Sequence, residues 1–240
     1  MISAVVITKN EEKNIERCIK SLLWCSEIVV VDDYSDDKTV KLAKKLGAKV
    51  YQHSLDNDFS EQRNFGLLKA KGDWVLFVDA DEVVSAKLQK EIIKSITQNK
   101  HVGFYIKRYD VWMGKVLKHG EVGNIKLLRL AKKNAGKWKR AVHEFWDVKG
   151  STAILENPFL HYPHKTIREF VGDINLYSTI HAKENMKEGK TKSFWKIFVL
   201  PFGKFFVNYF FKLGFLDGVA GFVMAVFMSF HSFLAWGKLK

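Results

Sequence analysis

The most constraining feature of the sequence is a short apolar run that ends in acidic residues. Trp74 to Val78 are all apolar, and Asp79, Asp81 and Glu82 follow with one alanine among them. Such a run predicts a buried strand that carries charge at its carboxyl end. In an extended backbone Asp79 and Asp81 point to the same side, so both can meet one hard cation. Because open α/β sheets bind ligands at this edge, the segment predicts a metal and phosphate site, with a simple acidic turn as the alternative.

Strand-like and helix-like segments alternate on both sides of this run. Strands are predicted at residues 2–7, 28–31, 49–51, 74–78 and 104–108, with amphipathic helices between them. This alternation predicts an α/β fold with a mostly parallel sheet, flanking helices and right-handed crossovers. The helix before the acidic strand is expected to have Ser60 as its N-cap and contains Arg63. The sequence has no Gly-x-Gly-x-x-Gly and no Gly-Lys-Ser/Thr loop, which leaves a dinucleotide or P-loop site without support.

A second acidic cluster follows the second predicted strand. Asp32 and Asp33 end that strand, and Asp36 and Asp37 come shortly after them. Since parallel strands that share a sheet end at the same edge, both acidic clusters are expected on one rim.

The segment from about residue 110 to 163 loses the regular alternation and is rich in Gly, Lys, Trp and His. It contains a basic run from Lys132 to Arg140, followed by Val142-His143-Glu144-Phe145-Trp146. We expect short strands and loops here that fold over the sheet edge and form an acceptor site, because binding residues concentrate on such connections. Residues 165–188 then predict a helix, with an exposed linker at 183–192.

The composition changes abruptly at Ser193. Twelve of the 19 Phe lie beyond this point. Three lysines at intervals of eight predict a cationic side opposite an apolar side, as in a membrane-associated amphipathic helix (Lys196, Lys204, Lys212). Residues 219–236 carry no formal charge and are barely long enough to span a bilayer, so a span stays open beside a monotopic hairpin, a core helix or an oligomer interface. The predicted divisions of the chain are residues 1–110, 111–192 and 193–240.

Charge and cysteine content narrow the classes of partner. A net charge of +13 calls for an acidic partner, which nucleic acid, an anionic membrane face and phosphorylated substrates all provide. Cys18 and Cys25 are too few and too close together for a disulfide framework or a zinc site, and both are expected as reduced thiols in a cytosolic setting. The N-terminus has no basic segment ahead of its apolar residues and predicts a strand rather than a signal peptide.

Four ordered segments resemble the signatures of inverting glycosyltransferase family 2. They are Val5 to Glu11, Val30 to Thr39, Arg63 to Gly66 and Phe77 to Glu82. Val142-His143-Glu144 and Gly214 to Gly218 are in addition similar to the branch that contains the lipopolysaccharide core glucosyltransferases. The resemblance covers nearly the full chain. It implies a GT-A fold, which is Rossmann-like, a nucleotide-sugar donor and a divalent metal, Mg²⁺ or Mn²⁺.

The resemblance also implies roles for individual residues. The nucleotide-sugar-binding residues would be Thr8, Glu11, Asp33, Arg63 and Asp79. Thr8 and Glu11 would border the nucleoside, Asp33 would accept from the base, and Arg63 would approach the uridine or diphosphate. Asp79 would face the ribose and the metal, with Asp81 as the principal metal ligand of a DXD motif. Metal and arginine together would neutralise the diphosphate as it leaves.

An inverting transfer needs a general base beside the acceptor hydroxyl. We expect Glu144 to be this base, because it lies in the irregular half between apolar neighbours. Asp147 is the reserve candidate, and a surface ion pair with Arg140 or Lys139 is the structural alternative for Glu144. Four residues are weaker candidates for contacting the acceptor or its phosphates: His143, His161, Lys139 and Arg140. Trp112, Trp138 and Trp146 are candidates for stacking on sugar faces, although core packing is the more common role of tryptophan.

The expected function is transfer of a hexose, glucose foremost, from a UDP-sugar to a cell-envelope glycolipid such as the lipopolysaccharide inner core. The expected location is the cytoplasmic face of the inner membrane, peripheral or monotopic, with a homo-oligomer left open. A polyisoprenyl-phosphate acceptor is the nearest alternative. Residues 75–83 also resemble the first motif of haloacid-dehalogenase-type phosphatases, with Asp79 as nucleophile, but that motif belongs on a first strand. A non-catalytic binder of membranes or nucleic acid would leave the acidic clusters unexplained, and no nucleic-acid partner is expected.

Overall fold

The computed structural model describes residues 1–56, 58–141, 144–163 and 166–239. The chain forms two compact units. The first contains Met1–Arg108 and Lys126–His161, and the second contains Tyr109–Ile125 and Tyr162–Lys240. The divisions at residues 110 and 192 that the sequence predicts stay a prediction.

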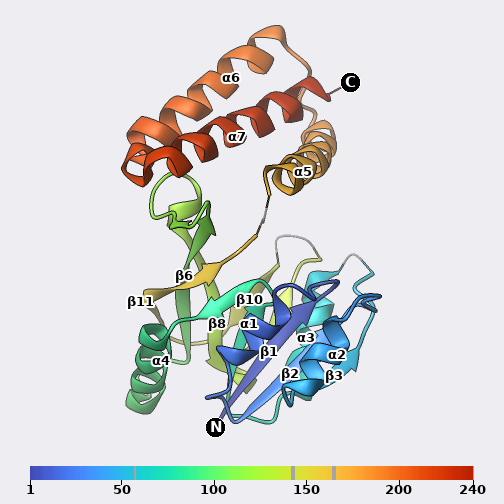
Figure 1. Cartoon of the computed structure of the whole chain (residues 1–240), viewed down its shortest axis with the longest axis vertical. Coiled ribbons are helices and arrows are strands. Elements are labelled where there is room, and N and C mark those ends of the chain that lie inside the picture. Colours follow the sequence, from blue (N-terminus) through green and yellow to red (C-terminus); the bar gives the residue numbers. More distant parts are fainter. Residues whose placement is uncertain (57, 142–143, 164–165, 240) are drawn as a thin grey trace. The chain divides into compact units, whose positions relative to one another are not determined.

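Four parallel strands form one half of the first unit's sheet. They are β1 (Ile2–Thr8), β2 (Glu27–Asp32), β3 (Lys49–Gln52) and β4 (Trp74–Asp79), in the order β3-β2-β1-β4. The helices between them are α1 (Ile15–Lys20), α2 (Thr39–Lys45) and α3 (Phe59–Lys69), as Figure 1 shows. The predicted alternation of strands and helices is confirmed here.

The other half of the sheet is mixed rather than parallel. From β4 the order continues through β8 (Ile125–Lys132), β6 (Gly103–Trp112), β11 (Thr152–His161) and β5 (Glu82–Val84), with β7 (Lys115–Val116) paired to β6. β8 is antiparallel to β4, and β11 is antiparallel to β5. A separate two-stranded sheet consists of β9 (Gly136–Lys139) and β10 (Phe145–Val148). Helix α4 (Ala86–Gln98) and a short 3₁₀ turn, Lys133–Ala135, complete this half, and a further 3₁₀ turn, Val122–Asn124, belongs to the second unit.

The expectation of only short strands between residues 110 and 163 is wrong for two elements. β8 has eight residues and β11 has ten. Both mix polar and apolar residues without strict alternation, because parts of each strand face solvent while other parts are buried. Periodicity is therefore a weak signal for them.

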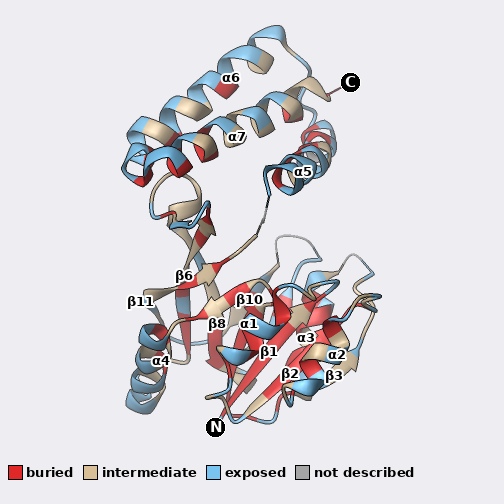
Figure 2. Cartoon of the chain, in the orientation of Figure 1, coloured by how far each residue is buried: buried red, intermediate tan, exposed pale blue. Residues whose placement is uncertain are grey.

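The strands divide the core into two layers because successive side chains point to opposite faces. Ala4 and Val6 of β1 face α1, α2 and α4. Val5 faces the other way, toward Leu67 of α3 and the β9–β10 sheet. Figure 2 shows the central strands as the most buried part of this unit. Cys18 lies in the first layer, and both cysteines are free thiols.

Helix α3 has its N-cap two residues before the position that the sequence predicts. Asp58, not Ser60, is the N-cap, and its carboxylate accepts a hydrogen bond from the backbone N–H of Glu61. Ser60 donates its hydroxyl to Asp58 instead. Gly66 sets how closely this helix packs on the sheet, since a Cβ at this position would overlap the side chain of Val5. The close approach fixes the height of Arg63, one turn earlier on the same helix.

The second unit is helical. Its helices are α5 (Ile167–Lys187), α6 (Phe194–Phe206) and α7 (Gly218–Gly237), with a π-helical turn, Val207–Phe211, and a 3₁₀ turn, Gly214–Asp217, between the last two. Helices α6 and α7 form a hairpin, and α5 packs on α7. The predicted helix at 165–188 is confirmed, although it includes part of the predicted linker. Its apolar core joins Trp112 and Phe170 to Ala220 and Met224 of α7.

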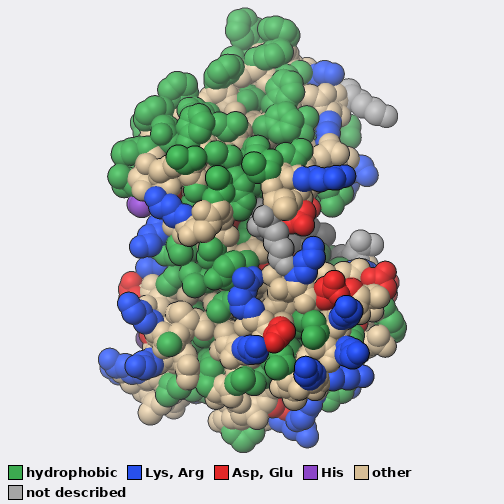
Figure 3. All heavy atoms as spheres, viewed as in Figure 1, with side chains coloured by type: hydrophobic (Ala, Val, Ile, Leu, Met, Phe, Trp, Pro, Cys, Tyr) green, Lys and Arg blue, Asp and Glu red, His purple; other side chains and the backbone are tan. Residues whose placement is uncertain are grey.

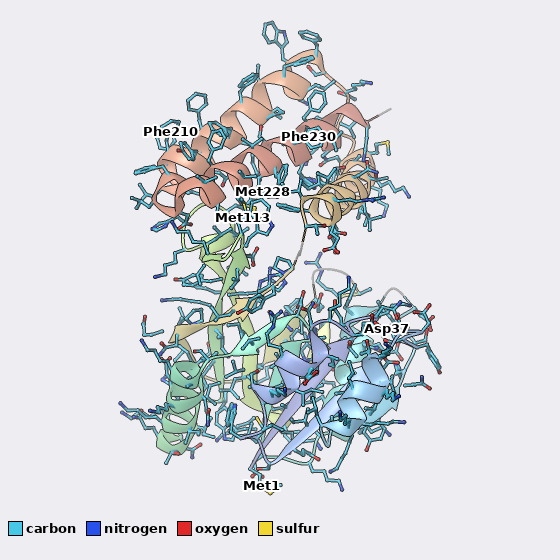
Figure 4. The ribbon with its side chains drawn as sticks, in the orientation of Figure 1. Met1, Asp37, Met113, Phe210, Met228 and Phe230 are labelled. Atoms are coloured by element: carbon cyan, nitrogen blue, oxygen red, sulfur yellow. The ribbon has the colours of Figure 1, made fainter. Side chains whose placement is uncertain are left out.

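Some polar side chains are buried in this unit, while many of its aromatic side chains are exposed. Asp217 is 3% exposed and Asn208 is 2% exposed. Phe211 is 81% exposed, and many other apolar side chains of the hairpin are exposed with it. Hydrophobic side chains cover the visible surface of α6 and α7 in Figure 3, and Phe210 projects from the hairpin in Figure 4. Residues Gly214–Gly237 are long and apolar enough to cross a membrane.

Buried polar contacts tie the hairpin to the loop after β7. The carboxylate of Asp217 accepts hydrogen bonds from the backbone N–H groups of Lys118 and His119, and its Oδ1 lies 2.9 Å from His119 Nδ1. Lys204 forms an ion pair with Glu121 at 2.7 Å. The lysine side that the sequence predicts opposite the apolar side thus includes one residue, Lys204, that pairs with an acidic residue of the same unit.

Candidate active site

The loops that follow β1 and β2 are joined by hydrogen bonds at the carboxyl edge of the sheet. The backbone N–H of Glu11 donates to Thr39 Oγ1 at 2.7 Å, and that of Glu12 donates to Asp37 at 3.0 Å. Asp37 is labelled in Figure 4. These contacts bring the first two signature segments together, as predicted from the ends of parallel strands.

Asp33 lies at this rim in a defined polar environment. Its Oδ2 lies 2.7 Å from Lys9 Nζ, and its Oδ1 accepts the backbone N–H of Leu55 at 3.1 Å. Burial alone would raise the pKa of Asp33, but these two donors hold the pKa below its ordinary value. Asp33 is therefore an ionised acceptor at neutral pH. Thr8 is buried nearby on β1, and its hydroxyl makes no hydrogen bond within the described residues.

Two arginines hold Asp79 at the end of β4. Arg129 Nη2 lies 2.7 Å from Asp79 Oδ2 and its Nη1 lies 3.2 Å from Oδ1. Arg63 Nη2 contacts Oδ1 at 3.0 Å. Burial would raise the pKa of Asp79, but the charges of Arg129 and Arg63 outweigh it and hold the pKa far below the ordinary value. In this structure the Asp79 carboxylate is occupied by guanidinium groups.

Asp81 is separate from this pair and faces a histidine. Its Oδ2 lies 3.1 Å from Nε2 of His161, the last residue of β11. The described residues contain no group of three or more His, Cys, Asp or Glu side chains arranged for a metal. The Asp81 carboxylate is still an oxygen ligand suited to Mg²⁺ or Mn²⁺, and the His161 imidazole adds a nitrogen ligand that a transition metal such as Mn²⁺ accepts more readily than Mg²⁺ does.

Glu82 lies beneath the acidic turn and is fully buried. One oxygen accepts the backbone N–H of Asp79 at 2.9 Å, and the other makes no hydrogen bond within the described chain. Burial, followed by the nearby charge of Asp79, raises the pKa of Glu82. The turn is thus supported by a carboxyl group whose charged form is disfavoured.

Arg63 connects the acidic turn to Glu144, the predicted base. Its Nε donates to Glu144 Oε1 at 3.1 Å, while its Nη2 holds Asp79. The guanidinium is 3% exposed and packs over the ring of Trp138 at 4.8 Å. Its Nη1 is buried and has no hydrogen-bond partner among the described residues, so it is available to one further acceptor.

Among the described residues, Lys139 and Arg140 make no ion pair or hydrogen bond with this network, whereas Trp138 packs against Arg63. Lys139 forms an ion pair with Asp147 at 2.6 Å, so the surface-pair alternative applies to Asp147 rather than to Glu144. Arg140 is exposed with a positive φ of 71°. His143 lies outside the described residues. Trp138 and Trp146 stack on each other in the core at 5.5 Å, and Trp112 belongs to the second unit's core.

Sequence reasoning missed two residues of this network. Arg129 was not singled out because its apolar neighbours Leu128 and Leu130 gave it the pattern of a strand residue. Asn64 fixes the position of Trp138 through two backbone hydrogen bonds, one donated by its Nδ2 and one accepted by its Oδ1, both 2.9 Å long. The adjacency of Arg63 and Asn64 in the signature segment was the only available signal for the latter.

Comparison with known proteins yields a family match. The family model for glycosyl transferase family 2 matches residues 3–146. An uncharacterized glycosyltransferase from Rickettsia typhi is 31% identical over all of this chain and 86% of its own length. The lipopolysaccharide core biosynthesis glycosyltransferase LpsC of Rhizobium meliloti is 27% identical over 99% of this chain and 91% of its own.

Solved structures show the same fold at lower sequence identity. TarS of S. aureus in complex with UDP-GlcNAc has a TM-score of 0.51 and 18% identity, over 93% of this chain and 79% of that chain. Glucosyl-3-phosphoglycerate synthase from Mycobacterium tuberculosis, in complex with Mn²⁺, UDP and phosphoglyceric acid, has a TM-score of 0.50 and 18% identity, over 80% of each chain.

Proposed function

The chain belongs to glycosyl transferase family 2, and from this premise we propose that it is an inverting glycosyltransferase that moves a hexose, glucose foremost, from a UDP-sugar to a cell-envelope glycolipid. The similarity to LpsC over nearly the full length supports an acceptor of the lipopolysaccharide core type. The family match also favours a transferase over the phosphatase that residues 75–83 resemble.

One observation carries the proposal. Arg63 contacts both Asp79 on the acidic turn and Glu144, which lies 81 residues further along the chain from Arg63. A candidate base and the first carboxylate of the DXD motif, Asp79, therefore share one buried network. Such an arrangement is what a displacement requires, because the base must lie near the bond that breaks.

We assign the donor to the rim formed by β1, β2 and β4. Thr8, Glu11 and Asp33 would bind the nucleoside, and the ionised Asp33 would accept from the ring N–H of uracil. Solved structures of this fold contain UDP, which is consistent with uridine as the donor base. The buried, unpartnered Nη1 of Arg63 would donate to the diphosphate.

The residues at the acidic turn fit a divalent cation. Asp81 and His161 would hold it, and Asp79 would serve the donor while its guanidinium partners fix its orientation. A bound cation of this kind neutralises charge on the departing diphosphate.

The chain's own residues account for the rest of the displacement. Glu144 would take the proton of the acceptor hydroxyl as that oxygen forms a bond to the anomeric carbon and the bond from this carbon to the diphosphate oxygen breaks. Arg63 binds only Oε1 of Glu144, and Oε2 makes no hydrogen bond with the described chain, so it remains for the hydroxyl. Attack from the face opposite the diphosphate inverts the configuration at this carbon.

A panel of nucleotide sugars with Mg²⁺ or Mn²⁺ and a lipopolysaccharide core acceptor tests the proposal, with nucleoside diphosphate release as the readout. Asp81→Ala is expected to lower release by about a thousandfold. Glu144→Gln should keep donor binding and lose transfer. Asp147→Asn should keep both donor binding and transfer, because Asp147 is paired with Lys139. If no donor is turned over, or if Asp147→Asn abolishes transfer while Glu144→Gln does not, the assignment is wrong. If the sugar is transferred to a polyisoprenyl phosphate and not to the lipopolysaccharide core, the proposed acceptor is wrong and the polyisoprenyl phosphate takes its place.

We also propose that the α6–α7 hairpin associates with the membrane, at its cytoplasmic face, where nucleotide-sugar donors are made. The support is the burial pattern of the second unit. Asp217 and Asn208 are buried there, while Phe194, Phe202 and Phe211 are exposed. Bilayers favour this distribution, and water does not. The hairpin would then keep the enzyme beside a lipid-linked acceptor.

A further inference from the structure

A cavity of about 170 Å³ lies beside Glu144 in the first unit. Tyr105 of β6 and residues 126–129 of β8 form one part of its wall, and residues of β9 and β10, including Trp138 and Phe145, form the other. At about 30 Å³ per water molecule, the cavity has room for roughly six waters. It therefore matches a single sugar ring rather than a whole nucleotide sugar.

The order of the strands separates this cavity from the loops assigned to the donor. The loops after β1 and β2 lie on one side of β4, whereas β8 and β6 lie on its other side. Arg129 lines the cavity and binds Asp79 at the end of β4. The cavity thus borders the acidic turn from the side away from the nucleoside loops.

The aromatic side chains of the cavity wall point to a sugar ligand. Tyr105 and Phe145 line the cavity and are exposed, and aromatic rings of this kind pack well against sugar faces.

The charged residues of the cavity wall indicate a second property of the ligand, its charge. Arg129 is neutralised by Asp79, and Glu144 is held by Arg63. Lys126 is exposed and forms no ion pair with the described part of the chain. The lining therefore contains one cationic group that lacks an anionic partner.

We infer that this cavity binds the acceptor through a sugar ring that carries an anionic substituent, with a hydroxyl at Glu144 and the negative charge at Lys126. This inference rests on the proposed transferase function and narrows its acceptor to an acidic sugar. A carboxylate and a phosphate both supply the required charge.

Ligand-detected NMR with the full-length protein, without donor, tests the inference. The probes are glucose, glucuronate and glucose 6-phosphate. The charged sugars are expected to bind about tenfold more tightly than glucose, the effect of one charge-assisted hydrogen bond. The two acids distinguish a carboxylate site from a phosphate site. Lys126→Met should abolish the preference and leave glucose binding unchanged, while Lys137→Met, at an exposed position of β9, should alter neither.

Equal binding of glucose and both acids by the wild type would overturn the inference, as would a preference that persists in Lys126→Met. Phe145→Ala is expected to weaken the binding of all three probes to a similar degree, because it removes an aromatic ring from the cavity and leaves the charge of Lys126 in place. Since the readout requires no donor, loss of nucleoside diphosphate release with retained preference for acids would count against the transferase and not against the site.

Discussion

The two units of this chain differ in what covers their surfaces. In the first unit the interior of the sheet is apolar, and charged residues gather at its carboxyl edge, where Asp79 meets two arginines. In the second unit Asp217 and Asn208 are interior, and phenylalanines cover the surface of the hairpin. This difference is the basis of the two proposals made above, a charged donor at the rim of the first unit and a membrane contact for the hairpin of the second.

The largest expected effect comes from breaking the buried charge network of the first unit. Arg129→Met leaves Asp79 partly buried with one guanidinium partner, and we expect it to lower the free energy of unfolding by about 3–5 kcal/mol. Urea unfolding followed by tryptophan fluorescence measures this change. Lys139→Met, which removes a solvent-exposed pair with Asp147, should change the free energy of unfolding far less. Similar costs for the two variants would mean that the network contributes no special stability.

A smaller effect is expected from the buried carboxylate of the second unit. Asp217→Ala removes the acceptor of the Lys118 and His119 N–H groups and should destabilise this region by about 2–3 kcal/mol. Hydrogen exchange of these two amides should accelerate, while amides of β1 keep their rates. The control is Glu188→Ala, at an exposed residue paired with Lys190. Faster exchange throughout β1 would show that the units do not unfold separately.

Substitution of exposed phenylalanines tests the proposed contact between the second unit and the membrane. Replacing Phe202 and Phe211 by serine should reduce partition to anionic vesicles by at least about tenfold, since each buried aromatic contributes about 1.5–3 kcal/mol. Vesicle sedimentation measures the partition. Leu68→Ser alters an exposed apolar residue of the first unit and should have no effect. Point changes are preferable to deletion of residues 193–240, which would also remove Asp217. Unchanged sedimentation of the double variant would contradict the proposed membrane contact.

The smallest effect is a pH dependence at the rim. Burial disfavours the charged form of Asp33, but Lys9 and the Leu55 N–H hold its folded pKa below the ordinary 3.8. Its contribution to stability is therefore present above about pH 4 and is lost as the pH falls through the folded pKa. Asp33→Asn should be less stable than the wild type at pH 7 by less than about 1 kcal/mol, and the difference should shrink toward pH 2. Thermal unfolding across this range measures it, and a constant difference would exclude the pair as its source.

Local patterns were sufficient for the parallel half of the sheet and for the positions of its acidic turns. The contacts of Asp79 and Glu144 were not predictable, because Arg129 reaches Asp79 only when β8 inserts beside β4, and the Arg63–Glu144 pair spans 81 residues. The concentration of Phe after Ser193 predicted the apolar hairpin. It did not predict that Lys204 would pair with Glu121, since that contact depends on a loop far away in the sequence.

The pairing of β11 with β5 makes strand length a determinant of the acidic turn. His161 lies opposite Glu82, and Phe159 lies opposite Val84. Because side chains alternate between faces, a shift of this pairing by one residue would turn the imidazole away from Asp81 without changing any residue at the turn. A single inserted or deleted residue within β11 is thus equivalent to loss of the histidine. Homologous chains that keep every motif but differ here in spacing would lack an imidazole beside the residue that corresponds to Asp81.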